Sequence, residues 1–167
     1  MKMIHFLAMT LPLCLGACSY AYDVKAVVIN GRLAFVVDPK SRHDPSCFNA
    51  IEVVARSEAR TSALPSDDVS LVEHGTFWNE RSDSECIDKF PIFYGQSLNG
   101  NSNPGEQRLR RVAAKPLRVG VVYEISITSG ATGYGGGAFN ILPDRRVVNV
   151  PYKTFIGDQE SVSSNAN

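Results

Sequence analysis

The chain has 167 residues, of which 44% are hydrophobic and 20% charged, and its formal net charge is zero because 17 basic residues balance 17 acidic ones. This length suits one domain, and the neutral balance gives no reason to expect a nucleic-acid partner. Beyond the N-terminal apolar run, no hydrophobic stretch has the length that a membrane-spanning helix needs.

The first residues have the layout of a secretory signal peptide. Lys2 supplies a positive charge, and the mostly apolar run Ile4–Ala17 is shorter than the roughly 20 residues of a membrane-spanning helix. The run ends in Leu15-Gly16-Ala17-Cys18, which resembles the lipobox of bacterial lipoproteins. This resemblance implies that residues 1–17 are removed and that Cys18 carries the lipid of a membrane anchor.

The residue after this cysteine is Ser19, at the position where an aspartate often marks retention in the inner membrane of Gram-negative bacteria. The resemblance therefore implies a lipid-anchored protein of the bacterial cell envelope, on the outer membrane and facing the periplasm. Residues 18–22 would be the acylated N-terminus and a short tether, with the first strand starting near Asp23. The alternative is an ordinary signal peptide cut near Ala21.

The expected location determines the role of each of the four cysteines. Cys14 would leave with the signal peptide and Cys18 would carry lipid, so Cys47 and Cys86 remain. Two thiols in an oxidising compartment most simply form one disulfide. Closing a loop of about 40 residues would contribute roughly 3–4 kcal/mol to stability. A redox pair is the alternative, but these cysteines lack the C-x-x-C spacing.

The remaining sequence predicts strands more readily than helices. Asn30-Gly31 lies between two apolar runs and indicates a two-residue hairpin. Further strands are expected in residues 47–56, in residues 69–78 and around Pro91, which indicates an edge strand.

The clearest strand pattern lies in residues 119–128. Five apolar residues alternate there with others, which predicts one buried face: Val119, Val121, Tyr123, Ile125 and Ile127. The glycine-rich residues 129–137 are expected to form a turn or bulge, and two more strands follow. Residues 157–167 have nothing to bury and predict a disordered tail.

A segment around Tyr123 carries a second resemblance. Leu117, Gly120 and Tyr123 are arranged as in the tyrosine corner of immunoglobulin-like and fibronectin type III-like domains. The resemblance implies that the Tyr123 hydroxyl bonds back to upstream backbone. We therefore expect an all-β fold with one disulfide, an antiparallel β-sandwich spanning residues 23–156. It would be Ig-like or have another sandwich topology, since the chain is longer than such domains and its cysteines are spaced differently.

No cofactor motif is complete. Gly133, Gly135 and Ala138 fit G-x-G-x-x-A, but no helix pattern follows to receive a pyrophosphate. Four acids gather in the chain without the pattern of a calcium loop, and no zinc spacing occurs: Glu80, Asp83, Glu85 and Asp88. We expect neither a cofactor nor a metal.

Ser97 is the one candidate nucleophile. Its surroundings, YGQSLNG, nearly match the nucleophile elbow G-x-S-x-G but have one residue too many before the second glycine. His74 and Asp83 would have to complete a triad. His43 lies in a polar loop between prolines and is expected at the surface. We therefore expect no enzyme.

Charge is distributed unevenly along the chain. Residues 67–88 hold seven acids and one arginine, whereas residues 108–118 hold five basic residues and no acid. Separated charge can orient a protein partner. The candidate partner-binding residues are Arg108, Arg110, Arg111 and Arg118, with Trp78 as a candidate hot spot. The alternatives are that both segments are solvated or face each other, and that Trp78 is a core residue.

These observations predict a non-catalytic protein-binding or accessory module that a lipid holds at the membrane surface. Within the same class, the alternative is an immunity lipoprotein that blocks a toxin. The alternatives from other classes are an envelope hydrolase using Ser97 and a passive structural lipoprotein.

Overall fold

The computed structural model describes residues 19–82, 86–99 and 111–152. The expectations for the signal peptide, for Cys18 and for the tail 157–167 therefore lie outside the described residues.

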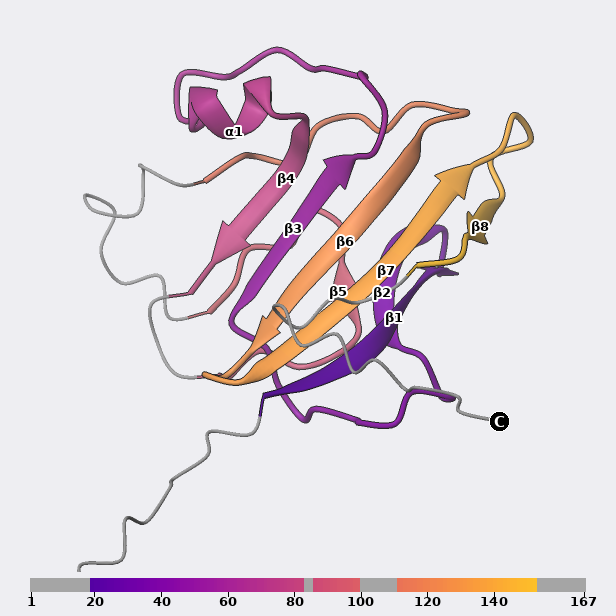
Figure 1. The fold of residues 1–167 in the computed structure, drawn as a ribbon. Helices are drawn as coiled ribbons and strands as arrows, with labels where there is room; N and C mark the ends of the chain where they lie inside the picture. The colour runs from indigo at the N-terminus through magenta and orange to yellow at the C-terminus, as the bar shows by residue number, and fades with distance from the viewer. Residues whose placement is uncertain (1–18, 83–85, 100–110, 153–167) are drawn as a thin grey trace, which may run out of the picture.

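The described residues form one curled sheet and one short helix (Figure 1). The sheet order is β4-β3-β6-β7-β1-β2-β5, and β8 also pairs with β7. The all-β prediction is confirmed. The sandwich is not confirmed, because the strands make a single sheet curled into a half-barrel, and β1 pairs with β7 in parallel. The elements are β1 Tyr20–Ile29, β2 Arg32–Val37, β3 Ala50–Ala55, α1 Val69–Glu73, β4 Thr76–Arg81, β5 Ile92–Phe93, β6 Val122–Ser129, β7 Gly133–Ile141 and β8 Val147–Asn149.

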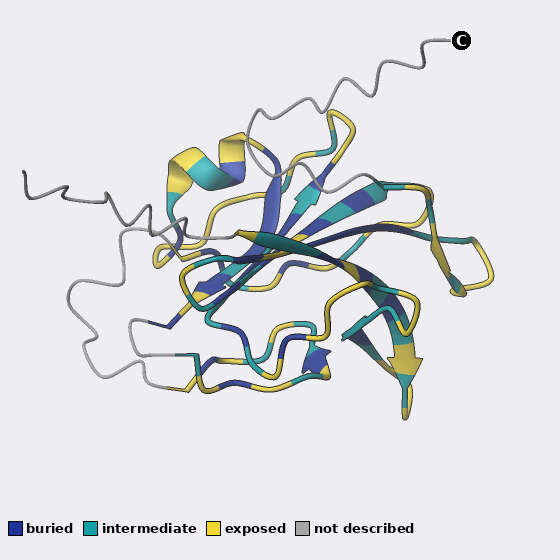
Figure 2. Ribbon diagram, turned by 60° about the horizontal axis from the view of Figure 1, so that its bottom comes forward, coloured by how far each residue is buried: buried dark blue, intermediate teal, exposed yellow. Residues whose placement is uncertain are grey.

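Strand β1 pairs with a different strand along each half of its length. Residues 20–23 pair with β7, and residues 24–29 pair with β2. The predicted hairpin follows at Asn30 and Gly31, whose φ angles of 49° and 76° fit a type I′ turn. Figure 2 shows that the sheet is curved and that its strands carry many of the buried residues. The strand begins at Tyr20, three residues before the expected start at Asp23, so most of the expected tether belongs to the sheet.

The predicted turn of the glycine-rich segment is present at residues 130–132, but residues 133–137 belong to strand β7 and not to the turn. The chain reverses before Gly133, and β7 carries its glycines where β1 crosses closely. A Cβ at Gly135 would lie 2.3 Å from Cε2 of Tyr22, and one at Gly137 would lie 2.2 Å from the Val24 carbonyl oxygen. Only glycine permits this approach.

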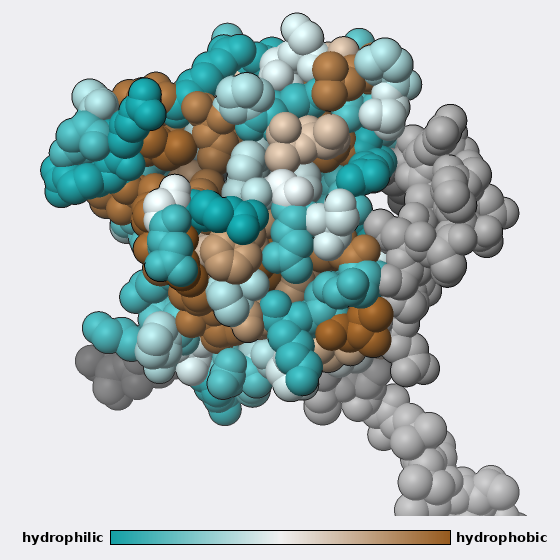
Figure 3. All heavy atoms as spheres, turned by 180° about the vertical axis from the view of Figure 1, so that it is seen from behind, coloured by the Kyte–Doolittle hydropathy of each residue, from teal (hydrophilic) through white to brown (hydrophobic). Residues whose placement is uncertain are grey.

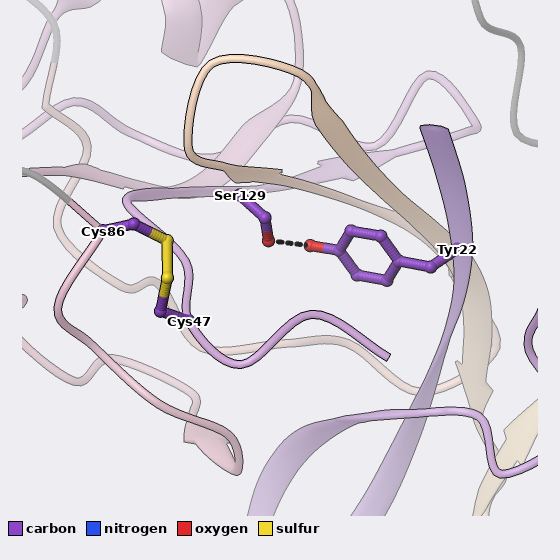
Figure 4. Close-up of a disulfide and its surroundings, with 4 residues drawn as sticks. All are labelled: Tyr22, Cys47, Cys86 and Ser129. Carbon is purple, nitrogen blue, oxygen red and sulfur yellow. Dashed lines mark hydrogen bonds between the residues drawn. A yellow bond between two sulfur atoms is a disulfide. The ribbon is translucent and has the colours of Figure 1, made fainter. Parts of the chain in front are cut away.

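The predicted disulfide is present at the end of the sheet where β1 begins. Cys47 and Cys86 are bonded, and the neighbouring residues Phe48 and Asp88 form a β-bridge. Figure 4 shows this disulfide near the Tyr22 hydroxyl, which shares a 2.7 Å hydrogen bond with the Ser129 hydroxyl. The disulfide therefore ties the segments before β3 and after β4 at the end where β1 begins.

The predicted buried face of β6 is largely confirmed. Tyr123, Ile125 and Ile127 are buried, but Val119 precedes the strand and is 50% exposed. The Tyr123 hydroxyl accepts a 2.8 Å hydrogen bond from the Arg118 backbone N–H. This bond to upstream backbone is the one that the tyrosine-corner pattern implied.

The expectation of extended structure throughout residues 69–78 is wrong for its first half. The Asp68 carboxylate accepts hydrogen bonds from the N–H groups of Ser70 and Leu71, which caps α1. Extended structure begins only at Thr76, the start of β4. Pro91 directly precedes β5 at the edge of the sheet, as predicted.

The contact between β1 and β7 can be tested with Gly135→Ala. The added methyl group would collide with the Tyr22 ring. We therefore expect the free energy of unfolding to be about 3 kcal/mol lower than in the wild type. Urea unfolding measures this, and the loss should shrink in a Tyr22→Ala background, where the ring is gone.

Gly130→Ala is the control for this prediction. Its φ of 58° strains any side chain, but no atom lies within 4 Å of its Cβ position. A Gly135→Ala loss no larger than that of Gly130→Ala would contradict the steric argument.

Candidate functional site

The acidic and basic segments of the sequence face each other in the fold. The ammonium group of Lys115 pairs with the Asp67 carboxylate, and both side chains are almost wholly buried, at 5% and 0% exposed. The same carboxylate accepts hydrogen bonds from the N–H groups of Leu64 (2.6 Å) and Ala113 (2.8 Å). These contacts join the loop before α1 to the segment before β6.

A second ion pair lies beside β4. The Arg111 guanidinium donates a 2.8 Å hydrogen bond to Glu80, whose side chain is 2% exposed. Backbone bonds between Asn79 and Val112 run in both directions, so this segment continues the sheet beyond β4. The charges that the sequence separates are therefore used, at these two places, for internal pairing.

The environment of Asp67 determines its charge. Burial by itself raises the pKa of its carboxyl group, but the hydrogen bond from Lys115 and those from two backbone amides outweigh it. The pKa of Asp67 is consequently lowered, and the carboxylate stays charged at neutral pH.

The other candidate partner-binding residues differ in position. Trp78 is 1% exposed and stacks with Phe35, so it belongs to the core and does not reach the surface. Arg118 is exposed, and its guanidinium donates to the Arg60 carbonyl. Arg108 and Arg110 lie outside the described residues.

The hydrolase candidates are not brought together by any contact that the described residues make. Ser97 is exposed, whereas the His74 imidazole lies 2.6 Å from the Ser70 carbonyl oxygen at the end of α1. Asp83 lies outside the described residues. His43 is exposed, as expected, and its ring packs on that of Tyr20.

The four acids of residues 80–88 fall into two groups. Glu80 and Asp88 are buried, and the Asp88 carboxylate accepts hydrogen bonds from the backbone and side chain of Asn99. Asp83 and Glu85 lie outside the described residues. Within the part of the chain that the structure describes, no three His, Cys, Asp or Glu side chains form a group that would hold a metal ion.

Two surfaces that sequence reasoning missed lie at opposite ends of the sheet. One is an open hollow beside Tyr20 and His43. At the other end, three apolar side chains are exposed in the loop before α1, at the first residue of α1 and before β6: Leu64, Val69 and Val119. The apolar residues carry no local pattern that marks them as exposed, because exposure depends on the neighbouring loops.

No protein-family model, no curated protein and no solved structure matches this chain. Among the described residues, no helix has the length and apolar character to cross a membrane.

The buried pair can be tested with Asp67→Asn, Lys115→Met and the double variant. Each single change leaves one buried polar group without its partner and should cost about 3–5 kcal/mol, and the double change should cost less than their sum. Urea unfolding at neutral pH measures these differences. An additive double variant would contradict a direct interaction.

The pair also predicts a pH dependence. The folded pKa of Asp67 is lowered, so its contribution is present above the unfolded pKa of about 3.9 and is lost as pH falls through the folded value. The wild type should therefore lose more stability in acid than Asp67→Asn. Arg146→Gln, which breaks an exposed pair with Asp144, is the control and should change little.

Proposed function

We propose that this protein is a lipid-anchored component of the bacterial cell envelope that binds a protein partner and has no catalytic role. The observation that carries the proposal is the position of Cys18, the lipobox cysteine, directly before the fold. Only Ser19 separates this cysteine from β1. The disulfide between Cys47 and Cys86 is consistent with an oxidising compartment such as the periplasm.

Exposed apolar residues at the other end of the sheet support protein binding. The side chains of Leu64, Val69 and Val119 are 51%, 55% and 50% exposed. We call the end of the molecule that carries these three residues the distal surface. The Gly120 N–H donates to the carbonyl of Ile141, the last residue of β7, so Val119 lies at the end of the sheet opposite Tyr20.

The distal surface is held by the buried contacts described above. Asp67 bonds to the backbone of Leu64, and α1 begins at Val69 directly after its cap. The Arg118 side chain adds a positive charge beside Val119. Seen from behind, the molecule carries hydrophobic residues in patches between hydrophilic ones (Figure 3). Exposed apolar side chains, one of them beside an arginine, suit a protein partner.

Lipidation can be tested on the full-length chain expressed in a Gram-negative host. We expect the mature protein to begin at Cys18 and to carry the added mass of a diacylglycerol. Cys18→Ser should abolish labelling by radioactive palmitate and leave the signal segment uncut at that position. An unlabelled wild type cut after Ala21 would contradict the anchor.

Partner binding can be tested with a photo-crosslinking amino acid at Val119 in living cells. We expect one saturable protein adduct, and an additional Leu64→Asp change should reduce its yield about tenfold or more, since it charges the contact surface. Val28 is the matched control position, because it is 54% exposed on the hairpin of β1. Identical adducts from Val28 and Val119 would contradict a specific surface.

A further inference from the structure

The hollow beside the first residues of β1 faces the proposed anchor. It has a volume of about 710 Å³ and is lined by Ser19–Ala21 and Arg42–Pro45. The rings of His43 and Tyr20 pack with their centroids 5.2 Å apart. In Figure 1 the chain between β2 and β3 runs along the end of the molecule where β1 starts. The hollow thus lies between the beginning of β1 and this chain segment.

Hydrogen bonds fix that segment against β1. The Ser41 hydroxyl accepts from the Asp23 N–H at 3.0 Å, and the Ser41 N–H donates to the Asp38 carbonyl at 2.7 Å. Pro45, at the other side of the hollow, is buried. Arg42 and His43 are therefore exposed side chains on a segment that is held on both sides.

Exposed cations that form no ion pair among the described residues lie at this end of the fold, as Arg32 and Arg145 do elsewhere. Five basic side chains of the described residues form ion pairs: Lys25, Arg56, Arg111, Lys115 and Arg146. Within the described ranges, Lys40 and Arg42 are exposed and form no such pair. Exposed Lys89 lines a neighbouring hollow together with Asp44, the acid of the same segment. Positive charge is thus available at this end, with Asp44 opposing part of it.

The short connection to Cys18 places these residues at a membrane. With one residue between them, the Cα atoms of Cys18 and Tyr20 are at most about 7 Å apart. The headgroup layer of a bilayer is roughly 5–8 Å thick. A lipid on Cys18 therefore holds Tyr20, His43 and Arg42 against the headgroups. This step rests on the function proposed above.

We propose that the hollow between β1 and residues 42–45 binds the phosphate of a phospholipid headgroup in the leaflet that holds the anchor. The guanidinium of Arg42 offers a planar set of donors that matches phosphate oxygens. The Tyr20 ring, half-buried beside it, suits the interface between headgroups and water. Lys40 and Lys89 add an attraction to anionic lipids that weakens with salt.

The test uses the full-length chain, purified with its lipid from host membranes and reconstituted in vesicles of phosphatidylethanolamine and phosphatidylglycerol. A photo-crosslinking amino acid replaces His43, and the same amino acid replaces Val28 as the matched control. We expect phospholipid adducts from position 43 and at least tenfold fewer from position 28. Mass spectrometry of the irradiated protein counts them. Equal yields from the two positions would overturn the proposal.

A charge variant separates recognition from mere proximity. Arg42→Gln should lower the adduct yield at position 43 several-fold, as should replacing phosphatidylglycerol with phosphatidylcholine or raising the salt concentration. Arg32→Gln makes the same charge change on the hairpin of β2 and should leave the yield unchanged. A yield that responds to neither Arg42→Gln nor the lipid charge would overturn the headgroup site.

Flotation of the vesicles before irradiation distinguishes the two proposals. A chain that fails to float with the vesicles lacks the anchor, which overturns the proposed function and this inference with it. A chain that floats but gives no phospholipid adduct at position 43 retains the anchor and overturns the headgroup site alone.

Discussion

The close approach of β1 to β7 is the constraint on which the rest of the fold depends. The rings of Tyr20 and Tyr22 lie over Gly133 and Gly135, where any side chain would collide with them. Because β1 pairs with β7 through its first residues and with β2 through its last, this contact connects β2 and β5 to the rest of the sheet. The strand that begins beside the proposed anchor is thus also the strand that holds the sheet together.

The features that the sequence predicted correctly are those with short-range causes. Asn30 and Gly31 supply positive φ angles within the turn itself, and Tyr123 bonds to backbone five residues earlier. The disulfide followed from elimination among few cysteines. By contrast, glycine disfavours strands by itself, and the reason for its presence in β7 is the ring of Tyr22, which is distant in sequence. Only the fold supplies that neighbour.

The helix α1 and the ion pairs of the candidate site also have no clear signal in the local sequence. Asp68 caps α1, but a helix of five residues is too short to show a helical period in the sequence. The sequence has two segments of opposite charge, but their charge pattern does not indicate that Asp67 pairs with Lys115 and Glu80 with Arg111. An ion pair between segments so far apart in sequence depends on the packing of β4. The position of Trp78 in the core likewise depends on the packing of that strand.

The two proposed binding sites lie at opposite ends of the sheet, and this separation would restrict the kind of partner. Strand β6 has eight residues, which span about 26 Å at roughly 3.3 Å per residue. With a lipid on Cys18, the distal surface would therefore lie about the length of β6 from the headgroups. Because a single residue connects Cys18 to β1, the domain could not move much further from the membrane. The two proposed binding sites lie at different ends, so headgroups and a partner would not compete. A partner held in the same membrane meets the distal surface at a raised effective concentration, which favours such a partner over one that diffuses freely.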